Sequence, residues 1–264
     1  MRCKKMMFIL SMFIVCVCWH ENVKAQTNME GVVYEEESGD YTLVNFTEDD
    51  FLRALGMDEE KIQSLDEDIK AFIVSDLKES EDWSDCKYLN GEFEEEVMMR
   101  ATEVLTGIEF SVATFKVTGG VKVYPTYEFT DKKKPAGNDC FSVQLGNALE
   151  MMEGTGKMWY YDDISTNSWI EGGNMVTNAL TLSSAEYSGS QLGTPDYPMK
   201  IKGCAVIRAQ IGSGTDKRVA LSYLYNPKNI AYSVSAPLLG GFGVSYSSTT
   251  GKIYSAAKIF ELNY

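Results

Sequence analysis

The sequence predicts an α+β protein: a small acidic helical N-terminal module followed by a mainly antiparallel β-sandwich or jelly-roll-like domain. One reason is the hydrophobic period, which changes from about 3.6 residues before residue 107 to roughly 2 after it. A second reason is charge, because residues 26–110 contain 25 Asp and Glu against 6 Lys and Arg, whereas residues 111–264 contain 12 against 14. A third is the run of short β-branched and aromatic segments between glycine-containing turns in the second part. We therefore expect a helical module over 45–107 and a β domain over 108–264.

The module contains signals for four helices. Thr47 stands three residues before Asp50, the spacing of a capping box, and an apolar face follows. A second helix is expected from Asp58 to Leu65 and a third from Asp66 to Lys78, where apolar residues recur at helical spacing. The fourth is expected from Glu92 to Leu105.

After residue 107 the alternating pattern predicts antiparallel hairpins. Each expected pair of strands is separated by a turn that contains glycine. The pairs are 110–117 with 121–129, 201–211 with 219–225, and 242–247 with 252–262.

The first 25 residues predict a cleavable signal peptide. Basic residues at positions 2, 4 and 5 precede an apolar run from Met6 to Trp19, and Val23-Lys24-Ala25 forms a small-residue cleavage site. As a helix the run would extend about 21 Å, short of the ~30 Å hydrocarbon core, although a retained anchor is the alternative. We expect an exported protein in the periplasm, at the cell surface or outside the cell, with no membrane-spanning segment after cleavage. Residues 26–44 would form an exposed lead-in with one strand at 41–44.

Loss of this segment would remove His20, the only histidine in the chain. Without histidine, Ser-His-Asp and Cys-His catalysis and histidine-based zinc sites are excluded. No specific catalytic motif and no phosphate-binding loop replaces it. The sequence therefore favours a protein without enzymatic activity, cofactor or metal.

The acidic module disfavours nucleic acid and anionic membranes as partners, because both would be repelled. The simplest interpretation of its charge is a solvated helical surface. Calcium binding is the alternative, at residues 35–37, 58–60 or 66–68, although none of these runs has the central Gly and closing Glu of a calcium loop.

Three cysteines lie beyond the expected cleavage site: Cys86, Cys140 and Cys204. Their spacings match no zinc motif. An oxidising compartment would permit one disulfide and one free thiol. Three buried thiols that pack as small apolar side chains are the alternative.

The candidate ligand-binding residues are aromatic and acidic and lie close together in the sequence: Trp159, Tyr160, Tyr161, Asp162 and Trp169. Flat aromatic faces stack on sugar rings, and carboxylates accept hydrogen bonds from hydroxyl groups. Asp163 adds a second carboxylate, but neighbours on a strand point to opposite faces, so Asp162 and Asp163 cannot together form a glycosidase acid/base pair. The alternative is that the aromatic side chains anchor a core and the aspartates begin a turn.

Two stretches are similar to an uncharacterised domain family of exported Bacteroidetes proteins. One is Phe46-Thr47-Glu48-Asp49-Asp50-Phe51-Leu52-Arg53-Ala54-Leu55-Gly56-Met57, which resembles an opening helix of that family that ends in Ala-Leu-Gly. The other is Trp159-Tyr160-Tyr161-Asp162 with Trp169, which resembles a segment bracketed by tryptophans. The resemblance implies export and a non-catalytic β domain, and it supplies no functional residue.

These observations leave three classes of function. The first is an exported binding or interaction protein that presents a glycan- or protein-binding surface. The second is a carbohydrate-active hydrolase that uses two carboxylates, one of them Asp162. The third is a structural component of the cell envelope or a pilus.

Overall fold

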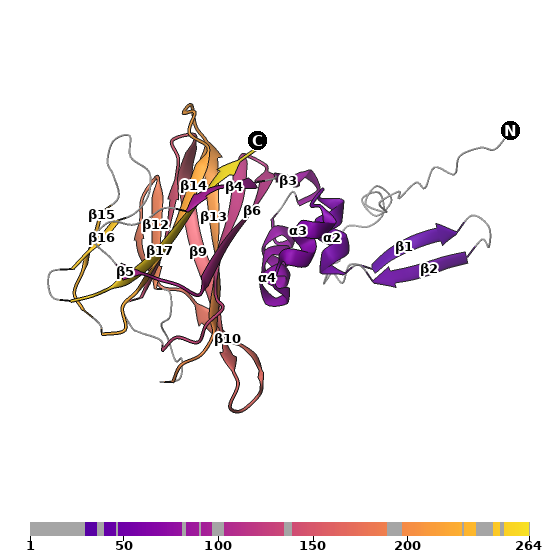
Figure 1. Ribbon diagram of the computed structural model, residues 1–264. Helices are drawn as coiled ribbons and strands as arrows, with labels where there is room; N and C mark the ends of the chain where they lie inside the picture. The colour runs from indigo at the N-terminus through magenta and orange to yellow at the C-terminus, as the bar shows by residue number, and fades with distance from the viewer. Residues whose placement is uncertain are drawn as a thin grey trace.

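The computed structural model shows an antiparallel β-sandwich with three helices packed against one of its sheets (Figure 1). It describes residues 30–35, 40–45, 47–80, 83–89, 91–96, 103–134, 139–188, 197–228, 230–235, 245–248 and 251–263. The α+β architecture predicted from the sequence is confirmed. The expected signal peptide and its cleavage site lie outside the described residues.

One sheet of the sandwich, here the helix-facing sheet, has six strands. In spatial order they are β10 (Ser168–Asn174), β9 (Leu149–Asp162), β13 (Ile201–Ile211), β7 (Gly120–Phe129), β6 (Ile108–Val117) and β3 (Lys87–Leu89). Every neighbouring pair in it is antiparallel.

The second sheet, here the far sheet, packs against the first. Its order is β11 (Thr177–Leu180), β12 (Ser184–Ser188), β8 (Cys140–Leu145), β14 (Arg218–Tyr225), β17 (Tyr254–Leu262) and β4 (Gly91–Glu96), with β5 (Glu103–Val104) parallel to β17. Two further ribbons pair β1 (Glu30–Glu35) with β2 (Asp40–Asn45) and β15 (Ser233–Ser235) with β16 (Ser245–Ser247). The strand predicted at 41–44 lies within β2.

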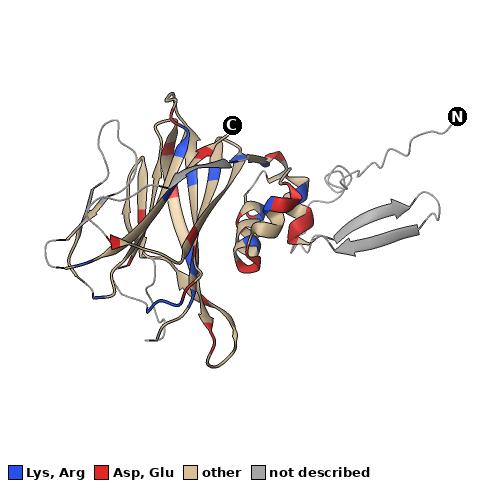
Figure 2. Cartoon of the chain, in the orientation of Figure 1, with Lys and Arg blue, Asp and Glu red and all other residues tan. Residues whose placement is uncertain are grey.

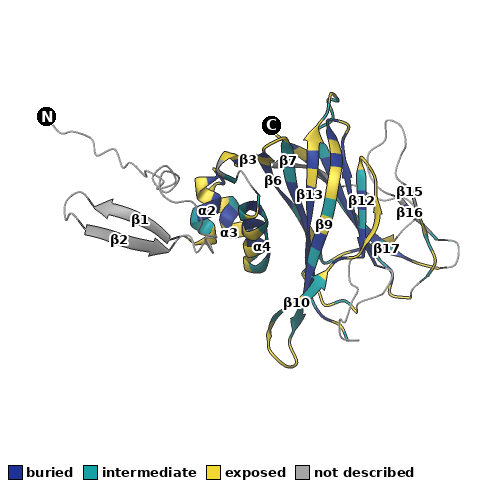
Figure 3. Ribbon diagram, turned by 180° about the vertical axis from the view of Figure 1, so that it is seen from behind, coloured by how far each residue is buried: buried dark blue, intermediate teal, exposed yellow. Residues whose placement is uncertain are grey.

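Two separate apolar cores stabilise this arrangement. Between the sheets, Tyr127 lies 4.8 Å from both Phe141 and Tyr223, measured between ring centroids, and Phe129 meets Tyr223 edge-on at 5.0 Å. The second core lies between the helices and the opposite face of the helix-facing sheet, and it includes residues from β6, β7, β9 and β13. The middle of that sheet is therefore covered on both faces, which explains the density of buried residues along β6, β7 and β13 in Figure 3.

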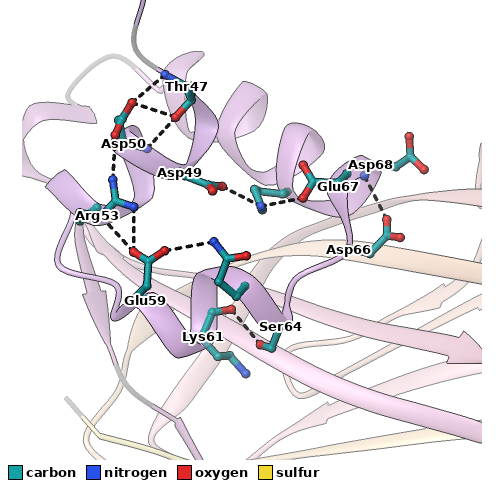
Figure 4. Close-up of polar contacts among 12 residues, drawn as sticks. Thr47, Asp49, Asp50, Arg53, Glu59, Lys61, Ser64, Asp66, Glu67 and Asp68 are labelled. Atoms are coloured by element: carbon teal, nitrogen blue, oxygen red, sulfur yellow. Dashed lines mark hydrogen bonds and ion pairs between the residues drawn. The ribbon is translucent and has the colours of Figure 1, made fainter.

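The three helices begin where the sequence predicts. They are α2 (Glu48–Ala54), α3 (Glu59–Ser64) and α4 (Glu67–Lys78), followed by the short 3-10 helix η1 (Trp83–Asp85). At α2 the backbone N–H of Asp50 donates to Thr47 Oγ1 at 3.2 Å, and the Asp50 carboxylate accepts from the backbone N–H of Thr47 at 3.1 Å (Figure 4). The predicted capping box is confirmed. Asp58 and Asp66 cap the other two helices.

Acidic residues are frequent along the helices (Figure 2), and several of their side chains have structural partners. Asp49 pairs with Lys70 at 2.6 Å, and Arg53 pairs with Asp50 and Glu59, each at 2.7 Å. The interpretation of the charge as a purely solvated surface is therefore too simple. Among the described residues, no group of three or more acidic, cysteine or histidine side chains is arranged to hold a metal ion.

The helix predicted over Glu92–Leu105 is wrong, because β4 and β5 occupy its two ends. Phe93, taken as the first residue of an apolar helical stripe, instead pairs with Phe260 of β17. The acidic run supplied a helical signal, but extending the far sheet gives the β17 backbone a partner that local propensity does not anticipate. The first strands of the sandwich thus precede residue 107.

The hairpin of 110–117 with 121–129 is confirmed as β6 and β7, whereas the hairpin of 201–211 with 219–225 is wrong. Both of those strands exist, but β13 pairs with β7 and β9, and β14 pairs with β8 and β17. With both edges of β13 already occupied, the chain must cross to the far sheet. The crossing is fixed by Asn147 Oδ1, which accepts from the backbone N–H groups of Thr215 at 3.0 Å and Asp216 at 2.9 Å.

The last predicted hairpin, 242–247 with 252–262, is also wrong. Ser245–Ser247 pairs with Ser233–Ser235, and β17 lies between β14 and β4. Residues 242–244 lie outside the described part of the chain. The β15–β16 ribbon instead contributes Tyr246 to a small core on the outer surface of the far sheet.

Cys86, Cys140 and Cys204 are buried and form no disulfide, as one of the two sequence interpretations proposed. Burial raises the pKa of Cys140 to about 11 and raises the pKa of Cys204 well above its ordinary value. A raised pKa disfavours the thiolate, which is the reactive form.

We predict that Cys86, Cys140 and Cys204 in the folded protein resist a thiol-alkylating reagent at pH 8. The same three sites should be labelled rapidly in denaturant, which serves as the control. Peptide mass spectrometry would locate the label. Rapid labelling of Cys140 or Cys204 in the folded protein would contradict the assignment.

Candidate functional site

The aromatic residues predicted to bind ligand lie at the end of β9 and in β10, and the alternation of the strand divides them between two faces. Trp159 belongs to the core beneath the helices, whereas Tyr160 packs against the core between the sheets. Tyr161 lies opposite Trp169 in the β9–β10 register, and their rings meet edge-on at 5.5 Å. The five predicted residues therefore do not share one surface.

Trp159 is covered by helix α4. Only 5% of its surface is exposed, and Phe72 of α4 meets its ring edge-on at 5.8 Å between centroids. Trp169 packs against the same core from β10 and is partly exposed. On this face of the hairpin, the aromatic segment forms part of the surface on which the helical module packs.

A lysine that the sequence interpretation missed lies in this packing surface. The side chain of Lys202, on β13, has no exposed surface, and its Nζ contacts Asp66 Oδ1 and lies 2.6 Å from Asp68 Oδ2. The same nitrogen lies 4.0 Å from the centroid of the Trp169 ring. A buried ammonium needs such partners, because an unpaired charge in the interior is strongly unfavourable. The signal that could have identified it is a single lysine among apolar residues in a strand buried on both faces.

A second lysine holds the other end of α4. Lys122 Nζ, from β7, lies 2.7 Å from Asp76 Oδ2 and donates to Ser80 Oγ at 2.9 Å. The hydroxyl of Tyr124 donates to the same Asp76 oxygen at 2.6 Å. Helix α4 is thus fixed near both ends by polar groups that project from the helix-facing sheet.

The other face of the hairpin presents a different group of side chains. Asp162 Oδ1 accepts from the backbone N–H groups of Ile164 and Ser165, both at 3.0 Å, and from the Tyr197 hydroxyl at 3.2 Å. These hydrogen bonds, above all the one from Ser165, lower the pKa of Asp162. The prediction that the aspartates begin a turn is confirmed. Burial, and then the bond to Asp162, raises the pKa of Tyr197.

The second group also includes Asp163 and residues from two other segments of the chain, one after β7 and one before β13. Asp163 forms an ion pair with Lys132, which follows β7, and this hydrogen bond lowers the pKa of Asp163. Tyr197 precedes β13, and the bridge between Lys133 and Met199 holds the two segments together. We call Tyr160, Asp162, Asp163, Tyr197 and Lys132 the hairpin-end cluster. Tyr197 and Lys132 were missed because they are distant in sequence.

The hairpin-end cluster is suited to binding polar groups. Tyr160 and Tyr197 are partly exposed, and both also pack against the core between the sheets. The two carboxylates are held in the charged form and can accept hydrogen bonds, and the Lys132 ammonium can donate them. Ile164, which follows Asp163 in the turn, is 69% exposed.

In the part of the chain that the structure describes, no helix combines the length and apolar character needed to cross a membrane.

No protein-family model and no curated protein sequence matches this chain. Among solved structures it is similar to Clostridium perfringens delta-toxin, with 6% sequence identity, a TM-score of 0.31, and coverage of 67% of this chain and 93% of the toxin. A pore-forming protein is similar with 7% sequence identity, a TM-score of 0.31, and coverage of 67% of this chain and 95% of that protein. The pilus backbone RrgB from Streptococcus pneumoniae is similar with 10% sequence identity, a TM-score of 0.25, and coverage of 67% of this chain and 84% of RrgB. These likenesses are too distant to carry an argument about function.

We predict that Trp159→Ala lowers the free energy of unfolding by about 3–5 kcal/mol, because it leaves a cavity between α4 and the sheet. Urea unfolding followed by circular dichroism would measure the change. Ile164→Ala, in the exposed turn of the same hairpin, is the control and should change it by no more than about 0.5 kcal/mol. Equal unfolding midpoints for Trp159→Ala and the unaltered protein would show that the ring is not a packing element.

Proposed function

We propose that this chain is an exported binding protein without enzymatic activity, and that it recognises a glycan through the hairpin-end cluster. The observation that carries the proposal is the clustering of two partly exposed tyrosine residues, Tyr160 and Tyr197, with two carboxylates whose pKa values are lowered. Sugar rings offer apolar faces for stacking and hydroxyl groups for hydrogen bonds. Export is supported by the basic, apolar and small-residue pattern of the first 25 residues.

The chemistry of Asp162 favours binding over hydrolysis. A glycosidase needs one carboxyl group that is protonated near neutral pH, which requires a raised pKa. The pKa of Asp162 is lowered, and its Oδ1 accepts from two backbone N–H groups and a tyrosine hydroxyl. Asp163 is likewise held ionised by Lys132. Neither residue is poised to protonate a leaving group.

The hairpin-end cluster differs from the site that the sequence alone indicated. Trp159 lies beneath α4, so its removal would test folding as much as binding. Tyr160 and Tyr161 are adjacent on β9 but belong to different faces. Substitution of Tyr160 therefore tests the hairpin-end cluster, and substitution of Tyr161 is the matched control on the other face.

We predict that the protein retains a subset of glycans on an array and that Tyr160→Ala weakens that binding at least about tenfold. Truncating an aromatic anchor typically removes more than about 1 kcal/mol of binding free energy. Titration of a retained glycan would give the two dissociation constants. Tyr161→Ala is the control and should leave binding within about twofold of that of the unaltered protein.

Two results would overturn the proposal. One is an array on which the folded protein retains no glycan. The other is equal affinity for the unaltered protein and Tyr160→Ala, which would remove this surface from consideration. Circular dichroism of both variants would show whether either loss comes from unfolding.

A further inference from the structure

Lys202 is surrounded by groups that can do more than neutralise its charge. Its side chain has no exposed surface, and its Nζ contacts one carboxylate and lies 2.6 Å from a second. Asp66 is 22% exposed and Asp68 is 41% exposed, so the nitrogen lies at the inner end of a site that opens to solvent on the carboxylate side. A primary amine is thereby held against the side-chain carboxyl group of another residue, with water excluded from the nitrogen.

The Asp66 carboxyl group is also polarised by the start of α4. Its Oδ1 accepts from the backbone N–H of Asp68 at 3.0 Å and of Ile69 at 3.3 Å (Figure 4 labels Asp66 and Asp68). Two N–H groups aimed at one carboxyl oxygen would stabilise negative charge that develops there during attack on the carboxyl carbon. The N-terminus of α4 adds its partial positive charge.

We propose that Lys202 and Asp66 condense to form an intramolecular amide that joins strand β13 to the start of α4. The amine nitrogen of Lys202 is the nucleophile, and Cγ of Asp66 is the electrophile. Asp68 is the group that transfers protons.

The step balances without an oxidant, reductant or activating reagent. One proton passes from the Lys202 ammonium through Asp68 to Oδ2 of Asp66, which leaves a neutral amine and a carboxylic acid. The nitrogen attacks Cγ, and the charge that forms on Oδ1 is held by the two backbone N–H groups. The Cγ–Oδ2 bond then breaks, and Oδ2 leaves as water with a second proton from the nitrogen. The amide nitrogen keeps the third proton.

Two further considerations favour the reaction. Conversion of a buried ion pair into an amide and free water removes two charges from a site where they are costly. Holding the reacting groups in contact also removes much of the entropic cost that they would face as separate molecules. Oδ1 remains an acceptor in the product, so the cap of α4 is preserved.

The environment of the pair contains one more carboxyl group. Glu128 of β7 lies opposite Lys202 in the strand register, and burial, with a smaller contribution from Asp66, raises its pKa. A carboxyl group that is more readily protonated beside the reacting pair can supply or accept a proton. Lys200 and Glu109 are the other charged groups that influence it.

The bond would tie together residues that are 136 positions apart. The three cysteines in the described part of the chain form no disulfide, so a cross-link of this kind would do what disulfides do in other exported proteins. It would prevent the helical module from leaving the sheet even in denaturant.

Mass spectrometry of the purified, denatured full chain tests the proposal. We expect a mass lower by one water than the mass calculated for the chain from the N-terminus of the purified protein. After trypsin digestion we expect one branched peptide that joins Asp66 to Lys202, with no cleavage after Lys202. The full mass together with cleavage after Lys202, in protein that has been left folded for several days, would overturn the proposal, as would a water loss at any other position.

Matched variants separate the bond from the fold. Lys202→Met and Asp66→Ser should both restore the full mass, and serine can still cap α4. Lys122→Met removes the other lysine that holds α4 and should retain the loss of water. Loss of the branched peptide in Lys122→Met, with its circular dichroism unchanged, would contradict the assignment to Lys202.

Discussion

The attachment of helix α4 to the helix-facing sheet is the constraint on which the rest of the structure depends. Lys202 and Lys122 project from neighbouring strands and meet Asp66 and Asp76 toward opposite ends of the helix. Between these two points the apolar face of α4 covers Trp159 and the outer surface of the sheet. Because a buried lysine without its carboxylate would be strongly unfavourable, the two pairs fix both the position and the direction of the helix. Apolar packing alone would fix neither as well.

This attachment explains part of the excess of acidic residues in the N-terminal half of the chain. The acidic residues of the module cap its helices, pair with its own Arg53 and Lys70, and meet the two lysines of the sheet. The excess of carboxylates on one segment is complementary to the buried Lys202 and the partly buried Lys122 on the other. A pattern that looks like a solubilising surface in the sequence is in part the docking surface of the module.

The sequence predicted those features that local signals determine. Capping residues such as Thr47, Asp58 and Asp66 locate three helix starts, and a Gly-Gly turn locates the β6–β7 hairpin. It failed where a partner distant in sequence decides the outcome. The segment after Glu92 becomes a strand because β17 needs a neighbour, and β13 cannot pair with β14 because β7 and β9 already flank it. Lys202 and Tyr197 escaped notice for the same reason.

The candidate site shows what an aromatic-rich segment can and cannot indicate. Residue type pointed to this hairpin, and Tyr160 and Asp162 lie in the cluster at its end, whose role in binding stays a prediction. Residue type could not show that the neighbouring Trp159 is covered by α4, because strand parity assigns a residue to a face without revealing what packs there. At the end of β9, Trp159 packs beneath the module, whereas Tyr160 and Asp162 belong to the hairpin-end cluster. Nearer the start of the strand, Leu149 and Met151 lie in the core between the sheets. The end of β9 thus attaches the module on one face and, on the other face, carries the residues that we propose for recognition of a glycan, where the lowered pKa of Asp162 favours binding over hydrolysis.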